Sequence, residues 1–326
     1  MMETARAILG EDFLAPVSAA LLYPDLAQRF LPVPFAALDR ATVLEQSWER
    51  AWRNHTGSDR FAEPLDRLWA DKARWTPALL LNATWVETGK RLIASNLQVA
   101  ASGDDVVFVD GDDAQAFFAP RSLALSTAAH MSARFTYVSP AGTLEKDGKL
   151  RGRVVDGGYF ENSGATATLE VLKMLPSMMD EDPRWEKVRT YVIHISNEPA
   201  NPGAPPDSLE SARNRLAIRP HRGLNEALSP LWALLNTRDA RGVYARETLA
   251  WHVGKDHFLE FGLCRRSGNV PLGWVLSTGT QNLMKAQLTG SNCASRRDPS
   301  KVLFDNPGKL ARIRELLGAG AVAPPR

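Results

Sequence analysis

Arg153-Val-Val-Asp-Gly-Gly-Tyr-Phe-Glu-Asn-Ser-Gly164 is the stretch of sequence that decides the fold. A short β-branched run ends in Asp156, a pair of glycines follows, and Asn162-Ser163 marks the start of a helix. A carboxylate at the carboxyl end of a strand is where α/β enzymes commonly build their sites. The stretch therefore predicts an α/β fold and makes Asp156 the first candidate for a functional residue.

Outward from this stretch, helix and strand patterns alternate along the chain. The runs at 78–86 and 91–99 are separated by a turn, so we expect them to pair as an antiparallel hairpin, and residues 148–152 read as a loop. The pattern predicts strands at 78–86, 91–99, 106–110, 153–156, 190–195 and 258–264, and helices in pieces over 5–31, after Asp39, and at 123–135, 165–175, 223–236, 240–251 and 277–288.

This order of elements predicts a mixed sheet flanked by helices, with a helical C-terminal part. We expect residues 1–197 to form the α/β domain. Residues 198–210 are rich in proline and glycine and read as a loop or linker. Residues 211–326 then continue the same domain as a mainly helical part.

Composition limits the classes of function. The 326 residues are 44% hydrophobic and 23% charged, with a net charge of +2, which gives no basis for a nucleic-acid partner. The N-terminus lacks the layout of a signal peptide, and no apolar run reaches the ~20 residues of a membrane span. We therefore expect no transmembrane segment, and a cytoplasmic location or a peripheral one at a membrane surface.

Asp156 allows two interpretations. A carboxylate beside a glycine pair can orient or deprotonate a neighbouring hydroxyl, because burial and backbone N–H donors tune its basicity. The alternative is a turn residue, since Asp-Gly is a common way for a chain to leave a strand. Taken alone, the motif does not decide between them.

The wider sequence resembles the patatin-like phospholipases, a family of lipid acyl hydrolases. The resemblance is carried by the Asp-Gly-Gly block and by further segments in the family's order: Asp12-Phe-Leu-Ala-Pro16, Leu21-Leu-Tyr-Pro-Asp25, Ala128-Ala-His-Met-Ser-Ala-Arg-Phe-Thr-Tyr-Val-Ser-Pro140 and Pro271-Leu-Gly-Trp-Val-Leu-Ser277. It implies a patatin-like sheet and hydrolysis of lipid acyl esters by a Ser-Asp dyad. Asp156 would be the base and Gly157 and Gly158 its flanking turn, with no cofactor and no metal ion.

The sequence departs from the family at the nucleophile. The family's serine lies in a Gly-x-Ser-x-Gly elbow beside a glycine-rich oxyanion loop. This chain contains neither pattern, and its segment resembling the one after the elbow begins about ten residues from Met1. We therefore expect a chain that is N-terminally incomplete and inactive alone, and that needs an N-terminal partner segment or self-associates. The alternative is a non-enzymatic scaffold or interaction module with the same fold.

A third class is a hydrolase with an unrecognised nucleophile. Ser126 and Ser132 are candidate hydroxyls, but serines inside a helix make poor nucleophiles without an elbow. His130 in the same segment is interpreted as a packed residue or as support for the site. His194 lies in a predicted strand, where we expect it to point into a packed or satisfied site, and no histidine pair has the spacing of a zinc motif.

Overall fold

The computed structural model describes residues 2–28, 30, 39–99, 108–135, 138–181, 188–196, 225–263, 276–289, 293–294 and 302–319. Contacts divide the chain into two units, Met1–Lys173 and Met174–Arg326, each described here by itself. The division falls inside one helix, whereas the proline-rich segment 198–210 lies outside the described residues. The division into an α/β part, a linker and a continuation stays a prediction.

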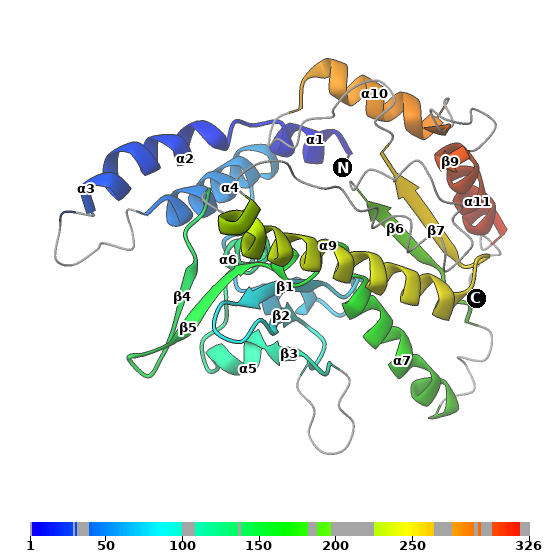
Figure 1. Cartoon of the computed structure of the whole chain (residues 1–326), viewed down its shortest axis with the longest axis horizontal. Coiled ribbons are helices and arrows are strands. Elements are labelled where there is room, and N and C mark those ends of the chain that lie inside the picture. Colours follow the sequence, from blue (N-terminus) through cyan, green and yellow to red (C-terminus); the bar gives the residue numbers. More distant parts are fainter. Residues whose placement is uncertain are drawn as a thin grey trace. The chain divides into compact units, whose positions relative to one another are not determined.

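The first unit begins with helices. They are α1 (Met2–Leu9), α2 (Leu14–Ala20), the π-helical turn η1 (Leu21–Asp25), α3 (Leu26–Gln28) and α4 (Arg40–Thr56) (Figure 1). The helix predicted after Asp39 is confirmed, and Asp39 caps it, because the Asp39 carboxylate accepts a hydrogen bond of 2.8 Å from the Thr42 amide. Helix α4 ends at Gly57, whose φ of 67° is easily reached only without a side chain.

A five-stranded mixed sheet forms the centre of this unit, which confirms the α/β class. Its strands are β1 (Leu80–Trp85), β2 (Arg91–Ser95), β3 (Gly111–Asp113), β4 (Gly142–Lys146) and β5 (Lys149–Asp156), in the order β3-β2-β1-β5-β4. Only β2 and β3 pair in parallel. The predicted hairpin is confirmed by the antiparallel pairing of β1 with β2.

Two predictions for this sheet are wrong. Residues 149–152 belong to β5, with Gly148 in the turn before it, and β4 and β5 run side by side as a hairpin (Figure 1). The turn uses Asp147 and Gly148 with φ of 55° and 69°, the backbone that two-residue hairpins favour. The polar residues and glycines at 148–152 are typical of a loop, yet residues 149–152 form the first half of β5. Residues 108–110 of the predicted strand 106–110 are not in a strand, and residues 106–107 lie outside the described residues.

Small residues let helix α6 (Leu125–Ser132) pack closely on the sheet. Ala128 is fully buried on the helix and Ala83 is almost so on β1, in one cluster with the large side chains of Leu65, Leu92 and Val154. Further helical pieces are the 3₁₀ turn η3 (Leu65–Trp69) and α5 (Ala114–Phe118). This core holds the carboxyl end of β5 in place.

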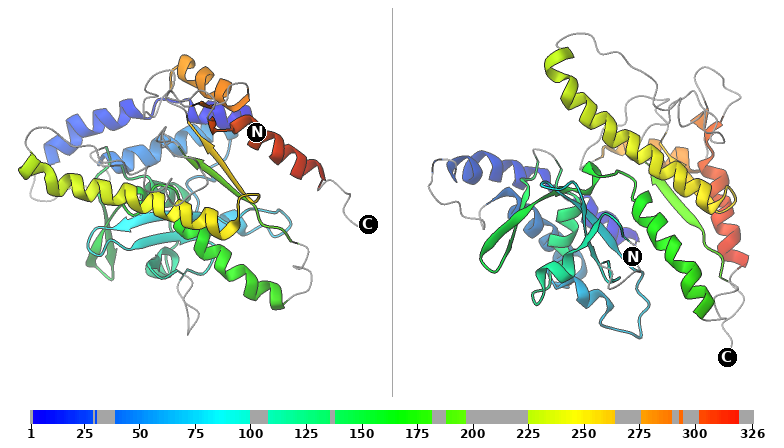
Figure 2. Two further views of the ribbon diagram at one scale, coloured as in Figure 1. Left: turned by 45° about the vertical axis from the view of Figure 1, so that its right-hand side comes forward. Right: turned by 60° about the horizontal axis from the view of Figure 1, so that its bottom comes forward.

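Helix α7 (Ala165–Glu181) runs across the division between the units. In the second unit, β6 (Val192–Ser196) pairs in parallel with β7 (Phe258–Gly262). Helix α9 (Asn225–Val253) is one unbroken helix where the sequence predicted two, as both views of Figure 2 show. Residues 237–239, which separated the two predicted helices, are polar but contain no glycine or proline to end a helix.

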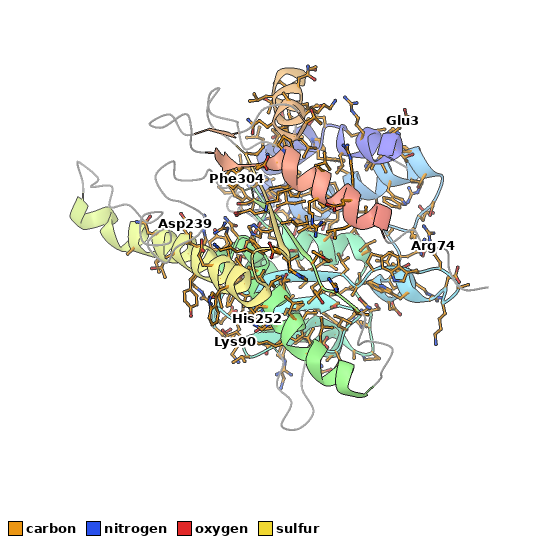
Figure 3. The ribbon with its side chains drawn as sticks, turned by 90° about the vertical axis from the view of Figure 1, so that its right-hand side faces the viewer. Glu3, Arg74, Lys90, Asp239, His252 and Phe304 are labelled. Carbon is orange, nitrogen blue, oxygen red and sulfur yellow. The ribbon has the colours of Figure 1, made fainter. Side chains whose placement is uncertain are left out.

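The rest of the second unit comprises α10 (Thr278–Thr289), β8 (Cys293–Ala294), β9 (Val302–Phe304) and α11 (Asn306–Ala319). The sequence reading missed α11. Phe304, labelled in Figure 3, packs over Gly262 of β7, where a Cβ atom would lie 2.3 Å from the ring. Across the described part of the chain, no helix combines the length and apolar character needed to cross a lipid bilayer.

Candidate functional site

Asp156 is the last residue of β5, as the sequence predicted, and its backbone is held on both sides. It pairs with Ala83 of β1, and its carbonyl accepts a hydrogen bond of 3.0 Å from the Thr84 hydroxyl. On the other side its amide donates to the Arg134 carbonyl at 3.2 Å. The side chain is half-buried, and Oδ1 accepts from the Gly158 amide at 2.7 Å. The structure thus fixes a partly solvated carboxylate at a strand end.

Space requires the first of the two glycines after Asp156. A Cβ atom at Gly157 would lie 2.2 Å from the Asn82 carbonyl oxygen, which is backbone, whereas one at Gly158 would meet only side-chain ends, Asn162 Oδ1 at 2.4 Å and Asp156 Oδ1 at 2.9 Å. Neither glycine has a positive φ, so backbone conformation is not the reason for glycine here. The 3₁₀ turn η4 (Gly157–Tyr159) can therefore lie directly against β1 and carry a donor to the carboxylate.

The helix start after the motif is built differently from the prediction. Ser163 contributes as expected, because its hydroxyl accepts from the Ala165 amide at 3.3 Å. The main cap is Glu161, which the sequence analysis missed: it is buried, accepts from the Thr166 amide at 3.1 Å, and is hydrogen-bonded by both the amide and the hydroxyl of Ser163. An acidic residue four positions before α7 was the available signal.

A buried ion pair lies beside the motif. Arg91 of β2 makes two parallel hydrogen bonds to Glu170 of α7, at 2.7 and 2.8 Å, and its guanidinium lies 5.0 Å from the centre of the Phe160 ring. Arg91 is 2% exposed. Strand β2, helix α7 and the turn that follows Asp156 are thereby joined through one side chain.

The second polar cluster of the first unit surrounds His130. This side chain is fully buried, with Nδ1 2.8 Å from Glu45 Oε1 and Nε2 2.8 Å from Ser139 Oγ. Thr127 donates to Glu45 Oε2 at 2.8 Å. Sequence reasoning singled out His130 but missed Glu45 and Ser139, which lie 85 and 9 residues away along the chain.

Arg134 shares this cluster. Its Nη2 lies 3.7 Å from Glu45 Oε1, and its Nη1 donates to the Pro140 carbonyl at 2.9 Å. Burial lowers the pKa of Arg134, and the charges of Glu45 and Asp39 oppose that effect. A cation remains at this position, balanced by Glu45.

The candidate hydroxyls of α6 do not lie in a nucleophile elbow. Ser126 is fully buried, and its hydroxyl donates to Glu49 Oε1 at 2.6 Å. Ser132 is the last residue of the helix and half-buried. Neither lies in the strand–turn–helix arrangement that activates a nucleophile.

His194 is buried in the second unit, as expected, although its imidazole lacks a hydrogen bond. Its Nδ1 lies 3.5 Å from Glu260 Oε1, within ion-pair distance, yet neither ring nitrogen makes a hydrogen bond. Arg246 binds Glu260 through two guanidinium nitrogens and Glu247 through the third. These residues join β6, β7 and α9.

Within the described segments, no group of three or more His, Cys, Asp or Glu side chains is arranged to hold a metal ion. A hollow between α1 and the end of α4 is open to solvent, and it is lined by Glu3, Arg6, Ala7, Gly10, Glu11 and His55. None of the residues singled out for function lines it.

Asp156, Gly157 and Gly158 lie in a turn that leaves the carboxylate partly open to solvent. A carboxylate so placed can accept a proton from a hydroxyl presented to it. No family model matches this chain, and neither a curated protein nor a solved structure does.

Proposed function

We propose that this chain carries the carboxylate half of a lipid acyl hydrolase site of the patatin-like type. Asp156 would take the proton from a serine hydroxyl as that oxygen attacks the acyl carbonyl, and return it to the leaving alcohol. Water would then release the acyl group from the serine. The observation that supports this proposal is the half-buried Asp156 carboxylate at a strand end, held by the Gly158 amide.

The reaction needs groups that this sequence does not show. A serine elbow and oxyanion donors each supply several kcal/mol of transition-state stabilisation, on the order of 3 kcal/mol for one donor. A carboxylate cannot replace them. We therefore propose that the chain works with a Gly-x-Ser-x-Gly segment and does not hydrolyse acyl esters by itself.

The experiment has two arms. In the first, the chain alone is treated with a fluorophosphonate probe and a p-nitrophenyl acyl ester, and we expect neither labelling nor hydrolysis. In the second, the chain is co-expressed with a strand–helix segment of the patatin-like type that carries the serine elbow. Labelling of that serine, with hydrolysis that depends on Asp156, supports the proposal. Stoichiometric labelling of the chain alone contradicts it.

The alternative is a non-enzymatic scaffold or interaction module with this fold. The lack of a Gly-x-Ser-x-Gly elbow in the sequence favours it. If neither arm of the experiment gives labelling or hydrolysis, the scaffold becomes the better account.

A further inference from the structure

Ser139, His130 and Glu45 are connected in the order used by serine hydrolases. The distances are 2.8 Å from Ser139 Oγ to His130 Nε2 and 2.8 Å from His130 Nδ1 to Glu45 Oε1. With the carboxylate accepting from Nδ1–H, Nε2 is left to accept the serine proton. The connectivity alone would suggest a nucleophile at Ser139.

The surroundings of Ser139 do not support nucleophilic attack. Its own amide donates to the Phe135 carbonyl at 3.1 Å, and the next residue, Pro140, has no N–H. In α/β hydrolases the residue after the nucleophile supplies an oxyanion donor. Ser139 is 6% exposed and His130 is fully buried, so neither the hydroxyl nor the imidazole is open to a substrate.

The three residues instead close the segment between α6 and β4, of which residues 133–135 and 138–141 are described. His130 binds Ser139, the Phe135 carbonyl binds the Ser139 amide, and Arg134 binds the Pro140 carbonyl. Glu45 connects this closed segment to α4 through its hydrogen bond with His130 and its ion pair with Arg134. Several interactions thus fix the described residues of this segment to the packed helix α4.

The closed segment bears directly on Asp156. The Arg134 carbonyl accepts the Asp156 amide at 3.2 Å, and Gly142, just after the segment, pairs with Val154 of β5. Strand β1 holds the other side of the same strand end. The carboxyl end of β5 therefore lies between β1 and the segment that Glu45, His130 and Ser139 close.

We propose that Glu45, His130, Ser139 and Arg134 are positioning residues that set the place of the Asp156 carboxylate. The catalytic meaning of that position rests on the proposed function, but the position itself can be measured without any activity. These four residues act through the Arg134 carbonyl, which accepts the Asp156 amide. By fixing the backbone of Asp156, they keep its carboxylate within hydrogen-bond distance of the Gly158 amide.

The test is amide hydrogen exchange of the full chain, followed by mass spectrometry of peptides. In Ser139→Ala, exchange of the peptide covering 153–160 should accelerate by about 10-fold or more, while that of 91–95 in β2 stays unchanged. The matched control is Ser47→Ala on α4, because Ser47 is equally buried but bonds only to the Val43 carbonyl of its own helix. It should alter neither peptide.

The outcomes are distinct. Equal acceleration of both peptides in Ser139→Ala would show a general structural role, and no acceleration at 153–160 would remove the link to Asp156; either overturns the proposal. If Ser139→Ala lacks a cooperative melt, the same peptides are read in Glu45→Gln, which keeps the size of the side chain. Fluorophosphonate labelling of Ser139 would also overturn it. Loss of the proposed hydrolase function would leave the exchange result intact.

Discussion

The backbone of Gly157 lies against the carbonyl of Asn82 so closely that a methyl group there would be 2.2 Å from the oxygen. Because the obstacle is backbone of a central strand, it cannot move aside at low cost. We expect Gly157→Ala to destabilise the protein by about 2 kcal/mol and to move the turn after Asp156. Urea unfolding measures the first effect.

Gly279 provides the matched control. It lies in the first turn of α10, and an added Cβ would be 3.8 Å from the nearest atom, the Ser277 hydroxyl oxygen. Gly279→Ala should leave stability unchanged or raise it slightly, by roughly 0.5 kcal/mol. Equal urea midpoints for the two variants would contradict the steric account of the Asp156 turn.

The Asp-Gly-Gly motif at a strand end predicted that the backbone at Gly157 and Gly158 lies close to a neighbouring group. It could not show what they approach. Asn82 is 75 residues earlier in the chain, and only the antiparallel pairing of β1 with β5 brings its carbonyl to Gly157. The β4–β5 hairpin was missed because β4 has one large apolar side chain, Leu144, and the first three residues of β5 are exposed.

The buried pair of Arg91 and Glu170 makes the second prediction. Removing the charge of one partner leaves the other buried and uncompensated, a cost of about 3–5 kcal/mol. We expect Glu170→Gln to lower the free energy of unfolding by much of that amount, because Arg91 is 2% exposed and would keep a buried charge without its partner. Chemical denaturation of the variant measures the loss.

An exposed ion pair serves as the control. Arg312 and Glu315 of α11 are 2.7 Å apart, with the Glu315 side chain 68% exposed. Glu315→Gln should leave the midpoint of unfolding unchanged, since water and salt screen such pairs. A Glu170→Gln variant that loses no more stability than Glu315→Gln would contradict a stabilising role of the Arg91–Glu170 pair.

The third prediction concerns acid. Burial by itself would raise the pKa of Glu260, but its interactions with His194 and Arg246 outweigh burial and lower that pKa to about 2. The unfolded chain binds this proton near pH 4.3. The stabilisation is therefore complete above about pH 5 and is lost as the pH falls towards 2.

We expect Glu260→Gln to be less stable at pH 7, by about 3 kcal/mol, and to lose part of the acid sensitivity between pH 5 and 2. Unfolding curves at a series of pH values would show it. If wild type and Glu260→Gln lose stability in parallel down to pH 2, the Glu260 carboxylate is not the source of the acid sensitivity. Glu315→Gln again gives the reference for an exposed acid.

The fourth prediction is self-association. Strands that pair in parallel are normally covered on both faces, yet Ile193 and Ile195 of β6 are 52% and 78% exposed. We expect the chain to associate as its concentration rises, and Ile195→Lys to shift it towards monomer. Sedimentation velocity measures the association of the wild-type chain and the shift in the variant. Leu317→Lys, at another exposed apolar position, is the control.

A wild-type chain that stays monomeric over the whole concentration range would remove the basis of that prediction. Equal effects of Ile195→Lys and Leu317→Lys would attribute association to general surface hydrophobicity instead of to β6.

The candidate site was only partly predictable. Asp156 and His130 were visible because each is a reactive side chain in an informative segment. Glu45 and Ser139 were not, because nothing in the spacing of a helix and a distant loop shows that both reach the same imidazole. Glu161 was overlooked because Asn162 and Ser163 are the more usual caps, whereas the buried glutamate does most of the capping here.

The most direct test of the central claim is the rate of p-nitrophenyl ester hydrolysis by the complex with a serine-elbow segment, compared between wild type and Asp156→Asn. Loss of a general base should lower the rate by about 10²–10⁴-fold. Asp147→Asn, in the exposed turn between β4 and β5, should leave it unchanged. An active complex whose rate is unaffected by Asp156→Asn would contradict the assignment of Asp156 as the base.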